Sequence, residues 1–290
     1  MLASPHHCLL SHPPTPCSVF LSRFGQALVS WFKGALPGAP SSVQAVHSAI
    51  APIMRPVFGL VEALFAFQLG LRGVRSPSLD VVADFYGYAQ VLDSSFQQAV
   101  AAGKIRVVAG EAACLASDGL HLAGAAPGAP ALPCDLVVAG TGFQADLSFL
   151  PPATQAALAA GAGGGQDGLY LYRHTLPVAV PDLAFVGSAV ATISNIATHG
   201  LQAEWLARLL AGKHALPGAP AMAQAVAAQA AWARGWMPST PSRASLVLLH
   251  QIHYHDQLCK DMGVAHRRKG GLGEIFWPYR PSDYNGIVGK

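Results

Sequence analysis

The chain has 290 residues, of which 52% are hydrophobic and only 11% are charged; an average soluble domain has roughly 25% charged residues. This length allows one large domain or two of ordinary size, so a small disulfide-stapled scaffold is excluded. The net charge of +3 comes with no basic run longer than the RRK at 267–269, which argues against nucleic acid as a partner.

The amino terminus, MLASPHHCLLSHPPTPC at 1–17, contains neither the basic stretch nor the continuous apolar stretch of a secretory signal. We therefore expect 1–45 to be an irregular or poorly ordered lead-in. The cysteines show no paired spacing, which predicts free thiols in a reducing, cytoplasmic compartment and no metal site. They are Cys8, Cys17, Cys114, Cys134 and Cys259.

The most apolar run of the chain is PVFGLVEALFAFQLGL at 56–71, which carries Glu62 near its middle. It is shorter than the ~20 residues that a membrane-spanning helix needs. The run predicts a buried or interfacial amphipathic helix, and association with a membrane surface through 56–71 is the alternative.

Three short apolar runs follow at 105–109, 112–116 and 120–123, separated by Gly-Glu and Ser-Asp-Gly. Separators of this kind are turn signals for hairpins, so the segment predicts a small antiparallel meander.

Two stretches resemble strands that end on glycine. DLVVAGTGF at 135–143 has an apolar run, 136–139, typical of a buried strand, and LAFVG at 183–187 repeats the pattern after a further strand-like run at 169–172. Glycine at a strand end lets the backbone approach a planar or phosphorylated ligand closely. It is also common in plain tight turns, so both interpretations stay open.

The rest of the chain carries helical signals. Gly212 stands where the second of four helices should stop. The aromatic and proline-rich tail after 263 predicts an extended wrap over another surface. The predicted helices are 153–160, 198–211, 221–236 and 243–263.

Two further patterns imitate binding motifs. GGGQDG at 163–168 fits the dinucleotide fingerprint, but it lies between an alanine-rich stretch and a strand-like run, so we interpret it as a loop. His250, His253 and His255 lie close in sequence, but a helix turns His255 about 200° away from His253. We expect no metal site here and a core role for His255.

Three stretches together resemble the carboxyl-terminal half of the flavin-containing monooxygenase family. CDLVVAGTGF resembles the family's strand and A-T-G-Y turn, with Gly140 for alanine and Phe143 for tyrosine. LYRHTLPVAVPDLAFVG and LQAEWLARLLAGKHALP resemble two later motifs, and the order and spacing agree over about 85–217. The matching residues of these two motifs are Leu171, Tyr172, Arg173, Pro181, Leu183, Ala184, Gly187, Leu201, Gln202, Trp205 and Gly212.

The resemblance implies FAD as prosthetic group, NADPH as reductant and O2 as oxidant. It also implies transfer of one oxygen atom to a small-molecule substrate, a soft nitrogen or sulfur nucleophile or a ketone. The implied fold class is α/β: part of a flavoprotein with two Rossmann-like dinucleotide-binding domains and a helical carboxyl-terminal cap.

On this interpretation, 46–134 is a remnant of the NADPH-binding domain and contains the meander, 135–240 is the carboxyl-terminal part of the FAD-binding domain, and 241–290 is a helix and extended tail. The resemblance implies cofactor contacts at the two glycine turns and assigns no catalytic residue. The implied contact residues are Gly140, Thr141, Gly142, Phe143, Gly187, Ser188 and Asn195.

The family's glycine-rich fingerprints for FAD and NADPH are missing before Phe85. We therefore expect an amino-terminally incomplete enzyme that holds FAD poorly on its own. A non-catalytic remnant or membrane-associated binding protein is an alternative. A second alternative is another kind of oxidoreductase that uses FAD and a pyridine nucleotide. It is disfavoured because Ser188 stands where such enzymes usually place aspartate and because the sequence has no redox cysteine pair.

Overall fold

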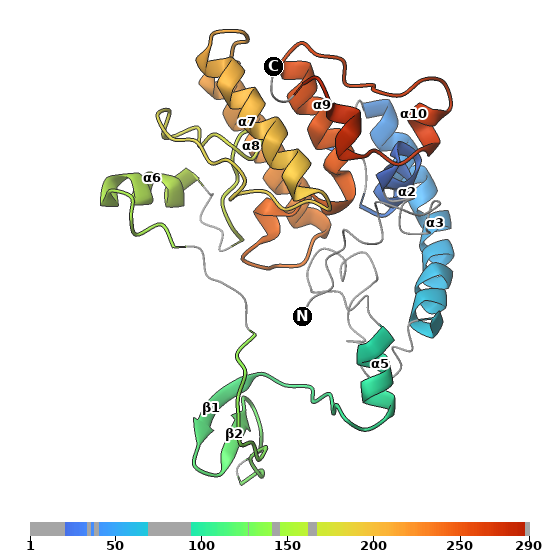
Figure 1. The fold of residues 1–290 in the computed structure, drawn as a ribbon, viewed down its shortest axis with the longest axis vertical. Helices are drawn as coiled ribbons and strands as arrows, with labels where there is room; N and C mark the ends of the chain where they lie inside the picture. The colour runs from blue at the N-terminus through green and yellow to red at the C-terminus, as the bar shows by residue number, and fades with distance from the viewer. Residues whose placement is uncertain are drawn as a thin grey trace.

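The computed structural model describes residues 21–33, 36–37, 41–68, 94–126, 128–140, 146–161 and 167–287. This part of the chain is mainly helical (Figure 1). Its α-helices and strands are α2 (Arg23–Lys33), α3 (Ser41–Gln68), α5 (Ser94–Ala101), β1 (Ala112–Ala116), β2 (Gly119–Leu122), α6 (Pro152–Gly161), α7 (Asn195–Leu210), α8 (Ala219–Trp236), α9 (Gln251–Asp261) and α10 (Gly273–Phe276). Its short 3-10 helices are η2 (Arg243–Ser245), η3 (Leu248–His250) and η4 (Pro281–Tyr284).

The main core lies among α7, α8, α9 and the segment 170–176. On α7 the buried residues follow helical spacing, with Leu201 and Trp205 fully enclosed. The helix stops as predicted, because Gly212 adopts a φ of +67° and its N–H donates to the carbonyl of Leu209. The predicted helices at 153–160, 198–211 and 221–236 are confirmed as α6, α7 and α8.

The expectation of an irregular lead-in at 1–45 is wrong for 23–33, which form α2, and for 41–45, which begin α3. α2 packs on the carboxyl-terminal part of the chain. The N–H of Tyr279 donates to the carbonyl of Leu21 at 2.7 Å, and Gln26 Oε1 accepts from the N–H of Ile252 at 3.1 Å. These partners are too distant in sequence for a local pattern to indicate them.

The predicted meander is confirmed for two of its three strands. β1 and β2 pair antiparallel, with Cys114 opposite His121 and Ala116 opposite Gly119. Leu132 pairs with Leu120 on the other side of β2 as an isolated bridge. Residues 105–109 form no strand, and the third segment beside the hairpin is instead Leu132, on the β2 side.

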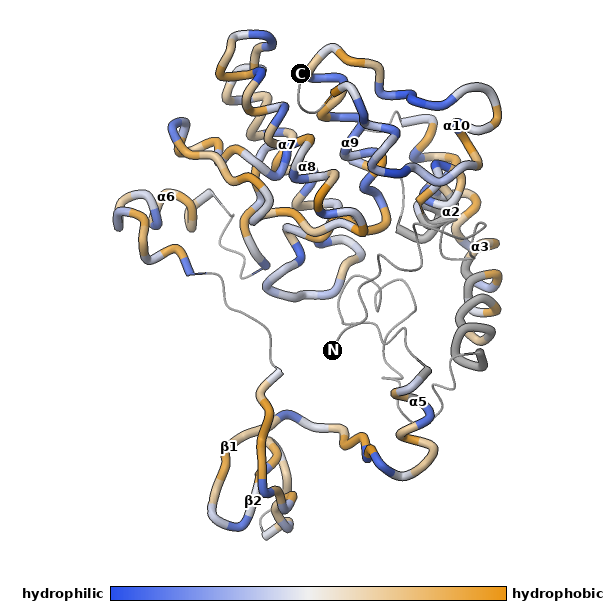
Figure 2. Tube along the Cα trace, in the orientation of Figure 1, coloured by the Kyte–Doolittle hydropathy of each residue, from blue (hydrophilic) through white to orange (hydrophobic). Residues whose placement is uncertain are grey.

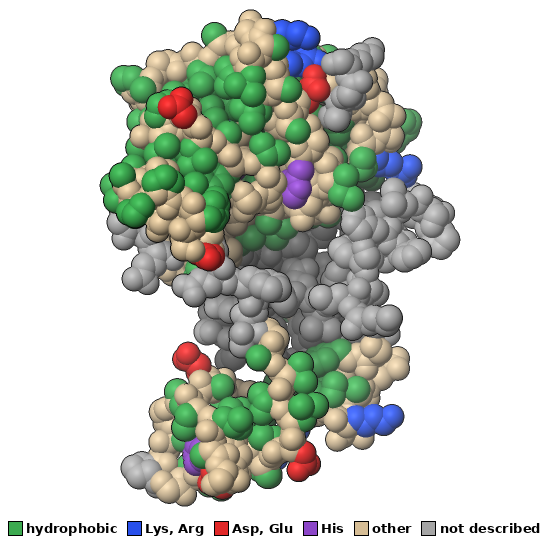
Figure 3. All heavy atoms as spheres, turned by 60° about the vertical axis from the view of Figure 1, so that its left-hand side comes forward, with side chains coloured by type: hydrophobic (Ala, Val, Ile, Leu, Met, Phe, Trp, Pro, Cys, Tyr) green, Lys and Arg blue, Asp and Glu red, His purple; other side chains and the backbone are tan. Residues whose placement is uncertain are grey.

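The predicted buried strand at 136–139 is wrong. These residues are extended but unpaired, and Leu136 and Val138 are 79% and 83% exposed. The segment rises from the hairpin as an apolar stretch (Figure 2), and Figure 3 shows apolar side chains over the surface of the hairpin region. A buried strand needs neighbouring strands, and the described residues contain only the β1–β2 sheet.

The strand-like runs at 169–172 and 183–186 also form no strands. Tyr172 pairs only with Leu176, across a tight turn. The Rossmann-like architecture implied by the resemblance therefore stays a prediction.

The single helix predicted at 243–263 is divided into η2, η3 and α9. The cause is a backbone bridge to the loop before α7: Ala191 donates to the carbonyl of Ser245 at 2.7 Å, and Val247 donates to the carbonyl of Ala191 at 2.9 Å. These bonds use groups that a continuous helix would need for its own ladder. The same bridge fixes the loop 187–195 against the carboxyl-terminal part of the chain.

Residues 56–68 of the apolar run belong to α3, which contains Pro52 and Pro56, while 69–71 lie outside the described residues. Among the helices that the structure describes, none is both long and apolar enough to span a membrane.

Candidate functional site

The loop that enters α7 turns at Gly187. This residue has a φ of +80°, and a Cβ there would lie 3.0 Å from the imidazole Nδ1 of His199. Its N–H donates to the side-chain carbonyl of Gln202 at 2.8 Å. Glycine is therefore required at this position by the backbone conformation and by the ring of His199.

Gln202 connects the Gly187 turn to a second turn. Its amide nitrogen donates to the hydroxyl of Tyr254 at 2.7 Å and to the carbonyl of His174 at 3.3 Å. The Tyr254 hydroxyl donates in turn to the carbonyl of Arg173 at 2.7 Å. Gln202 is fully buried, and both the oxygen and the nitrogen of its side-chain amide are hydrogen-bonded. It therefore holds the two turns in a fixed position relative to each other.

The second turn is strained, since Arg173 and His174 have φ values of 52° and 49° without being glycine. Such a backbone persists only when its surroundings hold it. Here the hydroxyl of Thr175 also donates to the carbonyl of Arg173 at 2.9 Å, and the Arg173 guanidinium pairs with Asp261 at 2.7 Å. Burial lowers the pKa of His174 to about 4, so its ring is neutral at pH 7.

The start of α7 is open to solvent. Ser194 makes no side-chain cap, and the first turn contains no acidic residue. Asn195 is exposed, Ile196 is 77% exposed, and Asn195 Oδ1 accepts from the N–H of Thr192 at 2.7 Å. The first N–H groups and the positive end of the helix dipole thus face an accessible surface, which suits an electronegative ligand edge.

A buried hydrogen-bond chain runs from this loop to the tail. Thr192 Oγ1 and Thr198 Oγ1 are 2.8 Å apart, Thr198 Oγ1 and His255 Nε2 are 2.7 Å apart, and His255 Nδ1 and the hydroxyl of Tyr284 are 2.9 Å apart. Burial lowers the pKa of His255 to about 3. Its neutral ring therefore donates at one nitrogen and accepts at the other. The core role predicted for His255 is confirmed.

One imidazole nitrogen beside these turns, His199 Nε2, is buried without a hydrogen-bond partner among the described residues. The His199 ring lies against the turn, since a Cβ at Gly187 would be 3.0 Å from its Nδ1. Buried polar atoms usually have a partner, so this nitrogen is available to a polar ligand atom beside the loop 187–195.

The structure gathers only part of the predicted site. Gly187 and Asn195 lie at the two ends of the loop before α7, and Ser188 is exposed beside Gly187. Gly140 belongs to the segment 135–140 after the hairpin, which lies away from α7 in Figure 1, and a Cβ on Gly140 would meet no atom within 4 Å. Thr141, Gly142 and Phe143 lie outside the described residues.

Sequence reasoning did not assign His199, Gln202 or Tyr254 to the site. The L-Q pair of LQAEW is the one signal that marks Gln202. His199 and Tyr254 carry no motif of their own. Across the described residues, no group of three potential metal ligands is close enough to hold an ion.

Comparison with known proteins gives one partial likeness. No protein-family model matches the chain, and no solved structure matches it. A segment of 115 residues is 33% identical to the probable flavin-containing monooxygenase 1 of Arabidopsis thaliana. The aligned segment is 39% of this chain and 21% of that protein, so the likeness extends over about a fifth of the relative. This partial likeness suggests an oxidoreductase of the flavin monooxygenase type and nothing more specific.

Proposed function

We propose that this chain forms the flavin-facing carboxyl-terminal part of a monooxygenase that uses FAD and consumes NADPH. It would transfer one oxygen atom from O2 to a soft nitrogen or sulfur nucleophile, or to a ketone. The observation that carries the proposal is the exposed, uncapped start of α7 beside the turn at Gly187. The partial likeness to a flavin-containing monooxygenase supports the reaction class.

The residues present fit the ring end of a flavin. The ring presents electronegative carbonyl oxygens, and the N–H groups at the start of α7, with Asn195, offer donors and a positive dipole end. The orphan nitrogen of His199 adds a polar group beside the same loop. For the pyrophosphate the fit fails, because the described residues contain no unit of strand, glycine-rich turn and helix.

A flavin held here would supply the redox chemistry and the activated oxygen. The chain's own contribution would be to bind and orient the ring. Gln202 fixes the Gly187 turn from behind, and the bridge between Ala191 and Val247 fixes the middle of the loop. A loop held at several points keeps its donors in place without reorganisation when the ligand binds.

A titration with three flavins tests the proposal. Purified protein is titrated with lumiflavin, FMN and FAD, and flavin fluorescence is followed. Because only the ring end is matched, we expect weak saturable binding with dissociation constants within about threefold of one another. Absence of saturable binding would refute the flavin assignment. If the protein is yellow as purified, with one flavin per chain, the claim that it lacks a pyrophosphate site is refuted.

Asn195→Asp places a negative charge at the start of α7 and keeps an acceptor for Thr192. We expect it to weaken binding of all three flavins by about fivefold or more, the equivalent of about 1 kcal/mol of helix-dipole interaction. The matched control is Asn285→Asp, an exposed asparagine after η4. Equal effects of the two substitutions would place the flavin elsewhere.

A further inference from the structure

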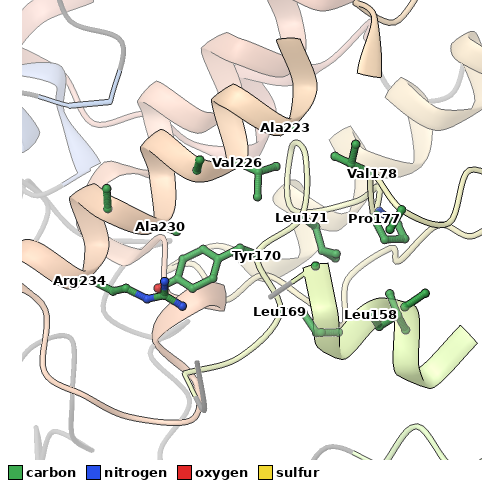
Figure 4. Close-up of a pocket in the computed structure, with 15 residues that line it drawn as sticks. Leu158, Leu169, Tyr170, Leu171, Pro177, Val178, Ala223, Val226, Ala230 and Arg234 are labelled. Atoms are coloured by element: carbon green, nitrogen blue, oxygen red, sulfur yellow. The ribbon is translucent and has the colours of Figure 1, made fainter. Parts of the chain in front are cut away.

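A separate cavity of about 440 Å³ lies between α6, α8 and the segment 169–179. None of its described lining residues belongs to the loop 187–195, so it is distinct from the candidate flavin site. Its volume is within the usual range of roughly 300–1,000 Å³ for small-molecule sites. Figure 4 shows Arg234 and Tyr170 at one end and Pro177 and Val178 at the other.

The walls of the cavity are apolar, and their small side chains explain the hollow. On α8 the lining residues follow one helical face, in which alanines such as Ala223, Ala227 and Ala230 leave room that larger side chains would fill. Leu158 of α6 and Leu171 close the opposite wall. A cavity with such walls favours a hydrocarbon chain over a polar ligand.

The polar end of the cavity carries an excess of positive charge. Asp167 is buried and accepts from two guanidiniums, Arg234 at 2.9 Å and Arg243 at 3.1 Å. The hydrogen bond from Arg234 is the main cause that lowers the pKa of Asp167 to about 2, so its carboxylate is charged at neutral pH. Among the described residues, the two guanidiniums and the one carboxylate of this cluster leave a net charge of +1.

Of these three charged groups only Arg234 lines the cavity. Its side chain is 36% exposed, and its guanidinium lies over the ring of Tyr170, 5.1 Å from the centroid. Arg243 is buried and also donates to the carbonyl of Pro238, so the cluster is held in place without a ligand. A ligand anion would therefore meet a preorganised cation at the end of an apolar slot.

We propose that this cavity binds an unbranched alkyl carboxylate, with the hydrocarbon chain along the alanine face of α8 and the carboxylate at Arg234. Charge complementarity selects an anion over a cation, and the single excess charge matches a monocarboxylate. The proposal is independent of the flavin assignment, because it uses other residues and a protein without flavin.

Isothermal titration with decanoate, 1-decanol and decyltrimethylammonium tests the proposal on the purified chain. We expect decanoate to bind about tenfold or more tightly than decanol, as expected for a charge-assisted hydrogen bond, and the cation not to bind. Between hexanoate and decanoate, each added methylene should tighten binding by up to about fourfold, because about 0.8 kcal/mol accompanies each buried methylene. Equal binding of decanoate and decanol, or no dependence on chain length, would overturn the proposal.

Substitutions locate the ligand. Ala227→Leu fills the slot and should abolish binding of decanoate and decanol alike, whereas the matched Ala225→Leu, on the opposite face of α8, should change neither. Arg234→Met should weaken decanoate to the level of decanol, and Arg234→Lys should keep most of the preference for the acid. Unchanged decanoate binding in Ala227→Leu or Arg234→Met would show that the ligand does not occupy this cavity.

Discussion

Arg23 on α2 and Asp256 on α9 form a two-pronged ion pair across a sequence separation of 233 residues, with Nη2 to Oδ1 at 2.8 Å. The same guanidinium donates to Glu274 and to the hydroxyl of Tyr279, and it lies 5.0 Å from the centre of that ring. Both carboxylates are largely buried. Arg23 is therefore a cation that allows two acids to be buried where α2 meets α9 and the tail.

Arg23→Met should lower the free energy of unfolding by about 3 kcal/mol, because it leaves buried carboxylates without their cation. The matched control is Arg208→Met, which removes a pair with Glu204 one turn away on α7 and should cost about 0.5 kcal/mol. Urea unfolding followed by tryptophan fluorescence measures both. Similar small losses would mean that α2 is not held by this cluster.

The role of α2 illustrates why part of the fold could not be predicted from sequence. α7 and α8 were predictable because their own residues carry the information, in an apolar stripe and in Gly212 as a stop. The partners of Arg23 come from the far end of the chain, and no local pattern indicates them. The run 136–139 was misassigned because apolar, β-branched composition predicts a buried strand without showing that neighbouring strands exist.

The candidate site divides in the same way. Gly187 could be found because a glycine at a turn leaves a mark in the sequence. The residue that fixes it, Gln202, is a buried polar side chain on α7, and only the structure shows its partners. The break of the helix predicted at 243–263 depends on a backbone bridge to Ala191, which side-chain patterns do not encode.

Gln202→Leu should loosen the Gly187 turn more than it unfolds the protein. It removes the acceptor of the part-buried Gly187 N–H, and loss of this hydrogen bond should cost about 1 kcal/mol. Hydrogen exchange at the Gly187 amide, read by NMR, should become faster by a larger factor than exchange in the middle of α8. The control is Gln257→Leu on α9, whose side chain contacts His253. Unchanged exchange at Gly187 would show that Gln202 does not position the loop.

Asp167 should contribute stability that depends on acid pH. Arg234, followed by Tyr170 and Arg243, holds its pKa at about 2, below the value of about 3.9 in an unfolded chain. A lowered pKa stabilises the folded state above the unfolded value, and that stability is lost as the pH falls from about 4 to about 2. The difference in unfolding free energy between wild type and Asp167→Asn should therefore shrink by roughly 2 kcal/mol over this window.

Urea titrations at pH 6, 4 and 2.5 measure this change. Asp182→Asn, at an exposed position before the Gly187 turn, is the control and should show the same small difference from wild type at each pH. A constant difference for Asp167→Asn would contradict the assigned pKa.

His255 should make the protein less stable in mild acid. Burial lowers its pKa to about 3 and that of His174 to about 4, whereas both would titrate near 6.5 in the unfolded chain. Below about pH 6.5 these histidines bind protons in the unfolded state but not in the folded state. The free energy of unfolding therefore has its full value above about pH 6.5 and falls toward about pH 4. Each histidine contributes a slope of about 1.4 kcal/mol per pH unit between about pH 6 and 4.5.

His255→Gln should therefore reduce the slope of unfolding free energy against pH by about 1.4 kcal/mol per unit, as well as lowering stability at pH 7. The loss at pH 7 has a separate cause, since glutamine cannot bridge Thr198 and Tyr284 with the geometry of the ring. His121→Gln on the hairpin is the control for the slope. If His255→Gln keeps the wild-type slope, the His255 imidazole binds its proton as readily in the folded state as in the unfolded state. Both ring nitrogens would then donate, and the hydrogen-bond chain from Thr192 to Tyr284 would contain a cation.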